Sequence, residues 1–361
     1  MELLLLIPVL FYFSFIRQTY GFLRLMQPFT SEGSSFNKIS VIIPCKNEEK
    51  NMPFILGDIK SQDYNTDLFE VIIIDDNSTD NTFREASDYE GIKNYKVLHN
   101  PDKGKKSAIG FGVYKASGEL IITTDADCRF GRKWISAHSK AYSTSHPDMI
   151  IGPVQLKERS GFPGRFMELE FLSLQGVTAG TALAYKPVMC NGANLSFKKE
   201  AYLRHSQNLH PELLSGDDIF LLHSLKKEPD SEISWLNSPD SMVTTCQPNS
   251  LFSFIKQRAR WISKAGSYSD TLSITLSIVT FVTIISIVFF MFAGIFKYEF
   301  WLLFLASFLI KSLADYMLLK EVTKIYRKTS LLKWFIPSQV IYPFYVLAVA
   351  CYSIVAGNKW K

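Results

Sequence analysis

The sequence lacks the features of a disulfide-rich, zinc-stabilised or common hydrolytic protein. It has only five cysteines in 361 residues, and no two of them have the short spacing of a structural zinc site. Their odd number and scattered positions predict free thiols. The H-E-x-x-H and G-x-S-x-G patterns of two hydrolase classes are absent. With 39 Lys and Arg against 34 Asp and Glu, the net charge of +5 is too small to indicate binding to nucleic acid.

Charged residues are missing altogether from residues 272–296. A helix of that length measures about 37 Å, enough to cross a bilayer. Residues 300–319 and 334–356 are two further candidate spans. Residues 3–16 are also apolar, and no basic segment or small-residue cleavage site accompanies them, which predicts an uncleaved anchor.

These runs divide the chain into three expected parts. Residues 1–28 would be a membrane anchor, residues 37–270 a soluble catalytic domain, and residues 271–361 a membrane region of about three spans. The segment 30–37 (TSEGSSFN) has the composition of a linker.

Basic residues beside the spans predict the orientation. All three groups of them lie on one side if residues 29–270 are cytoplasmic, and only Lys359 and Lys361 then fall outside. We therefore expect an integral protein of the cell membrane with a cytoplasmic catalytic domain. The groups are Arg17 and Arg24; Lys256, Arg258, Arg260 and Lys264; and Lys320, Lys324, Arg327, Lys328 and Lys333.

Two ionisable residues fall inside the third span. Lys311 and Asp315 are four residues apart, on one face of a helix, and ionised groups at membrane depth are costly unless they pair or face a cavity. We interpret them as a self-neutralising structural pair; the alternative is a polar wall for something that crosses the membrane.

The soluble part alternates β and α patterns. Short β-branched runs at 39–44, 70–75 and 119–125 predict strands, and helical periodicity predicts helices over 52–62, 79–89 and 105–116. Strands this apolar imply a parallel sheet covered on both faces, with ligands bound at the carboxyl ends of its strands. The first strand is followed by PCKNEEKN, which is not the glycine-rich turn of a dinucleotide-dependent oxidoreductase.

Carboxylates gather at these predicted strand ends. Asp75 and Asp76 follow the second strand, and Asp125 and Asp127 follow the third in the run TTDADC. Either pair could simply cap a helix or form a polar turn. Placed together in one crevice, they could instead hold a nucleotide and a divalent cation, and their hard oxygen ligands suit Mg²⁺ or Mn²⁺.

Two motifs follow further along the chain. SGDDIFLL places Asp217 and Asp218 before an apolar helix, where one of them could cap the helix or act as a general base. QRARWISKAG precedes the second span, and its cations could face lipid head groups or a diphosphate. Residues 162–184 predict a helix lying at the membrane surface; a buried core helix is the alternative.

The order VIIPCKNEEKN, IIIDDNSTD, TTDADC, CNGANLSF, SGDDIF and QRARW resembles the membrane-embedded family-two glycosyltransferases, which include cellulose, chitin and hyaluronan synthases and ceramide glucosyltransferase. The resemblance covers residues 39–264 and the arrangement of spans. It implies a GT-A fold and metal-dependent, inverting transfer of a hexosyl or N-acetylhexosaminyl group from a UDP-sugar to a glycan or lipid.

The same resemblance implies roles for individual residues. Asp75, with Asp76, would contact the uridine, Asp125 would hold ribose and diphosphate, and Asp127 with Asp125 would hold the metal. Asp218 would be the general base, although the family often has Glu-Asp where this chain has Asp-Asp. The element Q-x-x-R-W would be Gln257, Arg260 and Trp261. Independently of the resemblance, Lys103 and Lys105 in NPDKGKKSA could add to the positive field around the phosphates; a solvated basic turn is the alternative.

Two alternatives stay open. A polyprenyl-phosphate sugar synthase would share fold and donor but often lacks Q-x-x-R-W. A non-catalytic membrane scaffold or transporter would not need Asp75, Asp125, Asp127 and Asp218, which are all present.

Overall fold

The computed structural model describes residues 5–29, 35–184, 186–209 and 216–356, which form two compact units. An α/β unit consists of Gln27–Lys157 and Met189–Cys246. A helical unit consists of Met1–Met26, Glu158–Val188 and Gln247–Lys361. The segment predicted as one catalytic domain, 37–270, is thus shared between both units, because two of its helices bury their apolar faces among the long helices of the second unit.

A seven-stranded sheet forms the centre of the α/β unit, with the strand order β3-β2-β1-β4-β8-β6-β9. The four strands β1 to β4 are parallel, and the residues of β1, β2 and β4 are all buried. The strands are β1 (Ile39–Cys45), β2 (Phe69–Asp75), β3 (Tyr95–His99), β4 (Leu120–Thr123), β6 (Met149–Ile151), β8 (Leu195–Lys198) and β9 (Ile233–Trp235).

The sheet is mixed, whereas the sequence predicted a parallel one. Strand β8 runs antiparallel to both of its neighbours, β4 and β6. A small second sheet has the order β5-β10-β7, from β5 (Arg129–Phe130), β10 (Val243–Thr245) and β7 (Val154–Leu156). The helices of this unit are α2 (Met52–Lys60), α3 (Thr82–Ser87), α4 (Lys105–Lys115), α5 (Trp134–Ser145), α7 (Lys199–His205) and α8 (Asp217–Lys226). The α/β class predicted from the sequence is confirmed.

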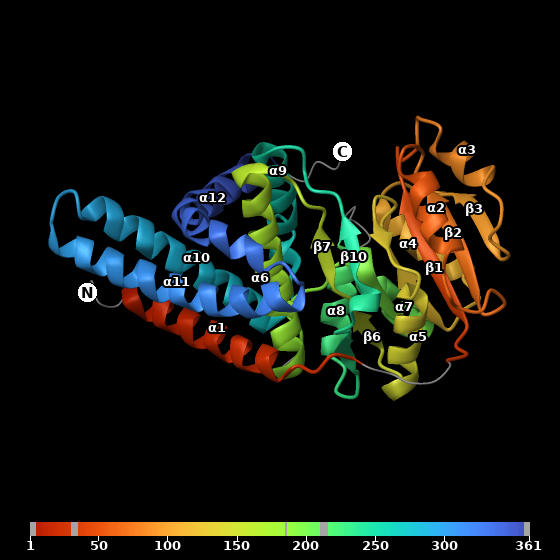
Figure 1. Ribbon diagram of the computed structural model, residues 1–361, viewed down its shortest axis with the longest axis horizontal. Helices are drawn as coiled ribbons and strands as arrows, with labels where there is room; N and C mark the ends of the chain where they lie inside the picture. The colour runs from red at the N-terminus through yellow and green to blue at the C-terminus, as the bar shows by residue number, and fades with distance from the viewer. Residues whose placement is uncertain (1–4, 30–34, 185, 210–215, 357–361) are drawn as a thin grey trace. The chain divides into compact units, whose positions relative to one another are not determined.

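The helical unit is built from long helices. In Figure 1, α1, α10 and α11 run beside one another, and each contacts the other two. Among the described residues, three helical stretches are long and apolar enough to cross a membrane: α10, α11 and Thr329–Ile354, which covers most of α12. The bounds are α1 (Ile7–Leu25), α6 (Gly161–Ala184), α9 (Leu251–Ile262), α10 (Thr271–Ala293), α11 (Glu299–Ile325) and α12 (Phe335–Ala356).

Helix α1 differs from the predicted short anchor. It runs to Leu25, well beyond the predicted end at residue 16, and it carries Arg17 and Arg24. It is not among the three candidate spans, although residues 1–4 lie outside the described part. The linker predicted at 30–37 and the tail with Lys359 and Lys361 also fall wholly or partly outside the described residues.

Helix α6, predicted as a surface helix at 162–184, is buried inside the helical unit. It packs against α1 and α11, and Glu168 and Glu170 on it are both buried. These carboxylates are paired: Lys328 lies 2.7 Å and Arg165 2.9 Å from Glu168. The charges that suggested a water-facing side of the helix are therefore internal ion pairs.

Two glycines allow α6 to approach its neighbours closely. Gly176 faces Val322 and Leu318 of α11, and Gly180 lies against Thr19 of α1. A Cβ atom added at Gly180 would lie 2.7 Å from the carbonyl oxygen of Thr19, which is backbone and cannot swing away. The spacing of four residues is the small-xxx-small pattern of tightly packed membrane helices.

The predicted pairing of Lys311 with Asp315 is observed. Their charged atoms are 2.5 Å apart, and both side chains are buried. Tyr12 of α1 donates to Asp315 at 2.6 Å, and Lys311 donates to Gln339 of α12 at 3.0 Å. The pair is neutralised within a polar cluster that joins α1, α11 and α12, as expected for a structural role.

Candidate active site

Asp75 lies at the carboxyl end of β2, where the register places it between Cys45 of β1 and His99 of β3. It is 1% exposed. Its Oδ2 accepts a hydrogen bond from the backbone N–H of Ser78 at 3.2 Å and lies 3.5 Å from His99 Nδ1. Its Oδ1 is buried and has no hydrogen-bond partner among the described residues. Since an unpaired buried acceptor is costly, this oxygen is suited to an N–H donor from a ligand.

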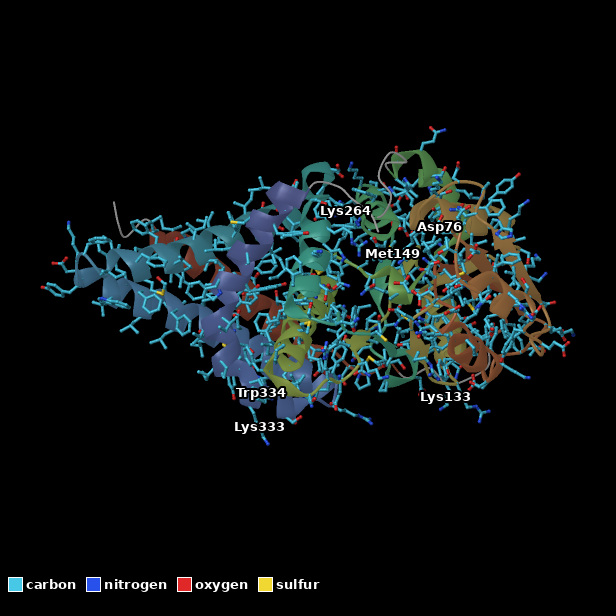
Figure 2. The ribbon with its side chains drawn as sticks, turned by 90° about the horizontal axis from the view of Figure 1, so that it is seen from above. Asp76, Lys133, Met149, Lys264, Lys333 and Trp334 are labelled. Carbon is cyan, nitrogen blue, oxygen red and sulfur yellow. The ribbon has the colours of Figure 1, made fainter. Side chains whose placement is uncertain are left out.

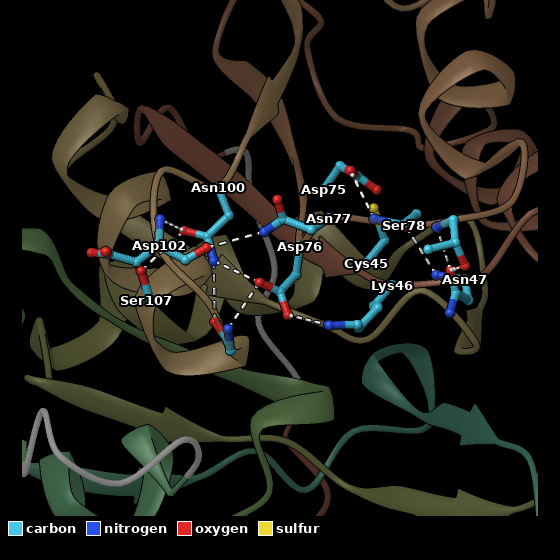
Figure 3. A network of polar contacts seen from close by, with 12 residues as sticks. Cys45, Lys46, Asn47, Asp75, Asp76, Asn77, Ser78, Asn100, Asp102 and Ser107 are labelled. Carbon is cyan, nitrogen blue, oxygen red and sulfur yellow. Dashed lines mark hydrogen bonds and ion pairs between the residues drawn. The ribbon is translucent and has the colours of Figure 1, made fainter. Parts of the chain in front are cut away.

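The carboxylate of Asp76, the next residue, is bound by other residues of the protein (Figure 3). Its carboxylate accepts from Asn100 Nδ2 and from the backbone N–H of Gly104, both at 2.8 Å, and it pairs with Lys46 at 3.3 Å. Gly104 has φ +100°, a conformation that favours glycine. Asp76 therefore fixes the turn that starts α4, whereas Asp75 has an oxygen without any partner among the described residues.

Lys105 is the first residue of α4 and forms an ion pair with Asp125. The distance from its Nζ to Asp125 Oδ1 is 2.5 Å. Burial alone would lower the pKa of Lys105, but the carboxylates of Asp125, Asp217 and Asp218 outweigh it and hold the pKa above its ordinary value. Lys105 is therefore a permanent cation between the D-x-D turn and the start of α8.

Asp127 is short of positive charge. Burial, helped by the nearby carboxylates of Asp125 and Glu48, raises its pKa to about 6. Its hydrogen bonds are long: Thr245 Oγ1 donates to it at 3.4 Å and Cys128 Sγ at 3.8 Å. A divalent cation held by Asp125 and Asp127 would supply the missing charge, so these residues fit Mg²⁺ or Mn²⁺.

The protein supplies only part of such a coordination sphere. No group of three or more His, Cys, Asp or Glu side chains is placed to hold a metal within 5–29, 35–184, 186–209 and 216–356. A cation on two carboxylates takes its remaining ligands from water or from the phosphates of a substrate, which is the usual arrangement for Mg²⁺.

Asp218 stands in the first turn of α8. Its Oδ2 accepts from the backbone N–H of Gly192 at 3.0 Å, and its Oδ1 accepts from the N–H of Ile219 at 2.8 Å. Each oxygen keeps a second lone pair for another donor. A Cβ at Gly192 would lie 3.5 Å from Asp218 Oδ2 and 3.7 Å from Lys105 Nζ, so this backbone lies beside both groups. Ser215 of the same motif lies outside the described residues.

One residue that the sequence did not single out organises this region. Asn194, fully buried, accepts from Trp134 Nε1 and lies within hydrogen-bond distance of His138 Nε2, both at 2.9 Å. It donates to the carbonyl oxygens of Pro153 and Ser241, both at 2.8 Å. Burial lowers the pKa of His138 to about 4, so its ring is neutral. The run CNGANLSF marked the segment but not this role.

The Q-x-x-R-W residues lie on α9, in the helical unit. The described contacts centre on Arg258, which the sequence indicated only as one basic residue among several. Its guanidinium donates twice to Glu170, at 2.9 and 2.6 Å, and once to Gln257 Oε1 at 2.9 Å. It also stacks on Trp261, 4.1 Å from the ring centroid. Arg258 thus holds Gln257 and Trp261 of the motif in place, while Arg260 is half-buried.

The predicted site residues therefore fall into two groups. Asp75, Asp125, Asp127, Lys105 and Asp218 all belong to the α/β unit, as does Asp76. Gln257, Arg260 and Trp261 belong to the helical unit. Within the α/β unit, contacts run from Asp76 through Gly104 and Lys105 to Asp125, and Lys105 shares its surroundings with Asp218.

Comparison with known families and curated proteins finds similarity over part of the chain. Residues 40–204 match the model of the family described as Glycosyl transferase family 2. An undecaprenyl-phosphate 4-deoxy-4-formamido-L-arabinose transferase of Proteus mirabilis is 40% identical over 95 residues, which are 25% of this chain and 29% of that protein. Glycosyltransferase AglE of Haloferax volcanii is 28% identical over 125 residues, 34% of this chain and 41% of its own length. The chain thus spans less than half of these curated relatives.

Among solved structures, the mannosyltransferase PcManGT from Pyrobaculum calidifontis, in complex with GDP-Man and Mn²⁺, aligns with 98% of both chains. The TM-score is 0.61 and the sequence identity 17%. This likeness supports the GT-A fold. The match to the Glycosyl transferase family 2 model covers less than half of the chain.

Proposed function

We propose that the protein is a membrane-bound, inverting glycosyltransferase that moves a sugar from a UDP-sugar to an acceptor in the membrane. The observation that carries the proposal is the contact chain from Asp76 through Gly104 and Lys105 to Asp125, with Asp218 beside Lys105. It gathers a cation and several carboxylates at the strand ends of a GT-A sheet, where such folds bind ligands.

Asp75 is the residue we assign to the donor base. Its free Oδ1 is a single buried acceptor, because Oδ2 already faces the Ser78 N–H and the His99 ring. Uracil offers one ring N–H, which matches one free oxygen. Guanine offers an N–H and an adjacent amino group, which suit a carboxylate with two free oxygens. This geometry favours UDP over GDP, although PcManGT was solved with GDP-Man.

Asp125 and Asp127 are the residues that would hold the cation, Mg²⁺ or Mn²⁺. Bound there, the cation supplies positive charge to the diphosphate that leaves when the sugar is transferred. Lys105 stands at the same place and contributes a second positive charge. Transfer with inversion needs no covalent intermediate on the protein, so these residues bind and neutralise but do not attack the sugar.

Asp218 is the candidate general base. Two backbone N–H groups orient its carboxylate, which leaves lone pairs for the proton of an acceptor hydroxyl. A phosphate acceptor is already deprotonated, and for such an acceptor Asp218 would orient the acceptor without taking a proton. The loss of transfer rate in Asp218→Asn would thus distinguish a hydroxyl acceptor from a phosphate acceptor.

A membrane lipid is the acceptor class that we favour. Three candidate spans among the described residues favour a membrane protein, and the Proteus mirabilis relative is named for transfer to undecaprenyl phosphate. Polyprenyl phosphate is therefore the first lipid to test. A growing β-linked polysaccharide is the second candidate, supported by the Q-x-x-R-W element on α9.

We further propose that the α/β unit is cytoplasmic, as the basic residues predict. Lys333 and Trp334 lie side by side in the helical unit (Figure 2), at the end of η6 (Thr329–Trp334), and such residues are typical of a membrane interface. Thr329 is exposed. In a background lacking the exposed Cys246 and Cys351, Thr329→Cys should resist a membrane-impermeant thiol reagent in intact cells and react after lysis. Reaction in intact cells would reverse the orientation.

The decisive experiment is product analysis with the purified full chain. It would be supplied with radiolabelled UDP-sugars, GDP-mannose as a competing donor, Mn²⁺, and either polyprenyl phosphate or a membrane lipid extract. We expect UDP release and a lipid-soluble product with one added sugar. A ladder of sugars would identify a processive synthase. Nucleotide release from no donor would argue for the non-catalytic scaffold.

A further inference from the structure

Lys105 already occupies one of the carboxylates that we assign to the cation. Its Nζ is 2.5 Å from Asp125 Oδ1, and the two side chains are only 23% and 34% exposed. A charge-assisted hydrogen bond of this length, partly shielded from water, is stronger than an ordinary surface pair. A divalent cation that uses this oxygen must therefore compete with an ammonium group that the protein supplies itself.

The backbone of Lys105 is fixed while its side chain can move. The preceding residue, Gly104, donates its N–H to the buried Asp76 at 2.8 Å, and α4 continues for 11 residues from Lys105. The lysine side chain, by contrast, is a flexible four-carbon stem with a compact charge at its tip. The ammonium can leave Asp125 without any rearrangement of the sheet or of α4.

A second anionic environment lies within its reach. Asp217 and Asp218 both act on Lys105 electrostatically, and the position of a Cβ at Gly192 would be 3.7 Å from Lys105 Nζ and 3.5 Å from Asp218 Oδ2. Asp125 and Asp218 therefore both lie near Lys105. A diphosphate that arrives with the cation would offer a third partner, with more negative charge than either carboxylate.

We propose that Lys105 is an internal counter-cation that competes with the divalent metal for Asp125 and yields its place only when the nucleotide diphosphate arrives. The inference rests on the proposed function and adds an order of binding to it. Without nucleotide, the metal must break the ion pair between Lys105 and Asp125. With nucleotide, the ammonium moves to the phosphates, so metal and nucleotide strengthen each other's binding.

The test is the affinity of the full chain for Mn²⁺ in detergent micelles, with free Mn²⁺ measured by electron paramagnetic resonance, before and after addition of UDP. Lys105→Met should bind Mn²⁺ roughly tenfold more tightly than wild type when UDP is absent, because a charge-assisted hydrogen bond no longer has to be broken. The same variant should bind UDP more weakly. Lys105→Gln is a second neutral replacement, and Lys105→Arg should behave as wild type.

Lys115→Met is the matched control. Lys115 is an exposed lysine at the other end of α4, and its loss changes the net charge equally. Its Mn²⁺ affinity should equal that of wild type, which separates a local competition from a general charge effect.

The possible outcomes distinguish a failure of this inference from a failure of the proposed function. If both neutral variants bind Mn²⁺ as wild type does without UDP, while Asp127→Asn binds it more weakly, the competition is refuted and the metal site stands. If the wild type binds neither Mn²⁺ nor UDP, the proposed function fails and the inference with it.

Discussion

The ion pair between Glu170 and Arg258 offers a sharp quantitative test of how α9 is held. Both side chains are buried, at 8% and 5% exposure. Arg258 Nε lies 2.9 Å from Glu170 Oε1 and Nη2 2.6 Å from Oε2, and Tyr345 of α12 donates to Oε1 at 3.1 Å. The carboxylate of Glu170 therefore links α6, α9 and α12, and the Arg258 guanidinium neutralises its charge.

The expected magnitudes follow from this burial. Removing one partner of a buried pair strands the other charge and costs about 3–5 kcal/mol, whereas replacing both by apolar residues of similar size is often neutral or stabilising. We expect Glu170→Met and Arg258→Met each to fall in this range. Arg258→Met should be worse by about 1 kcal/mol, since it also removes the stacking on Trp261 and on Phe254, 4.1 and 4.3 Å from the ring centroids. The double variant should recover most of the loss.

The assay is the free energy of unfolding of the full chain in mixed micelles, followed by helical circular dichroism, for wild type, both single variants and the double variant. Arg84→Met breaks the exposed pair with Asp88 and serves as the control, with no measurable change expected. The reasoning is refuted if the two single effects simply add in the double variant, within about 0.5 kcal/mol, because additivity is the behaviour of residues that do not interact.

Three further predictions concern the site and the packing of α6. Asp218→Asn should lower transfer to a hydroxyl acceptor by roughly 10²–10⁴-fold with UDP affinity kept, and transfer to a phosphate acceptor far less; equal rates for variant and wild type with both acceptors would leave the chain without an identified base. Because the pKa of Asp127 is raised to about 6, Mn²⁺ affinity should fall as the pH drops through that value. The metal-free protein should lose stability as the pH rises from about 4 to about 6, since the folded state holds the proton more tightly than the unfolded state. Both trends should vanish in Asp127→Asn, and their persistence in this variant would assign them to another group. Gly180→Ala should destabilise the helical unit by about 1–3 kcal/mol, because its Cβ would meet the Thr19 carbonyl, whereas Gly21→Ala, with nothing within 4 Å, should be neutral or slightly stabilising; thermal melts of the two that coincide would contradict the close packing.

The buried strands were predictable, and the exposed edge was not. β1, β2 and β4 are continuous β-branched runs, and their predicted bounds agree with the structure within about two residues. β3, with the sequence YKVLH, has only exposed and half-buried residues at the edge of the sheet, and β8 enters antiparallel between two other strands. Strand order and direction depend on long connections whose geometry leaves no local pattern.

The candidate site was predictable by residue type but not by contact. D-x-D and Asp75 stand where strand ends place them, yet the pairing of Lys105 with Asp125 depends on how α4 approaches the end of β4. The prediction that α6 lies at a surface was wrong for a similar reason. Glu170 is neutralised by a residue 88 positions away, and Glu168 pairs with one 160 positions away as well as with the nearby Arg165. The distant partners are not visible in the local sequence, which therefore resembles a water-facing surface.

The hydrogen bond from Tyr12 to Asp315 has a consequence for synthesis. The two residues are 303 positions apart, so at ribosomal rates of about 5–20 residues per second α1 leaves the ribosome roughly 15–60 seconds before its partner exists. During that interval the polar edge of α1 must be held by lipid, by the insertion machinery or by α6, which arrives earlier and also contacts α1. The α/β unit, encoded almost entirely between the two, has time to fold first. Assembly of the helical unit is therefore a late event, completed only when the last helices have been synthesised.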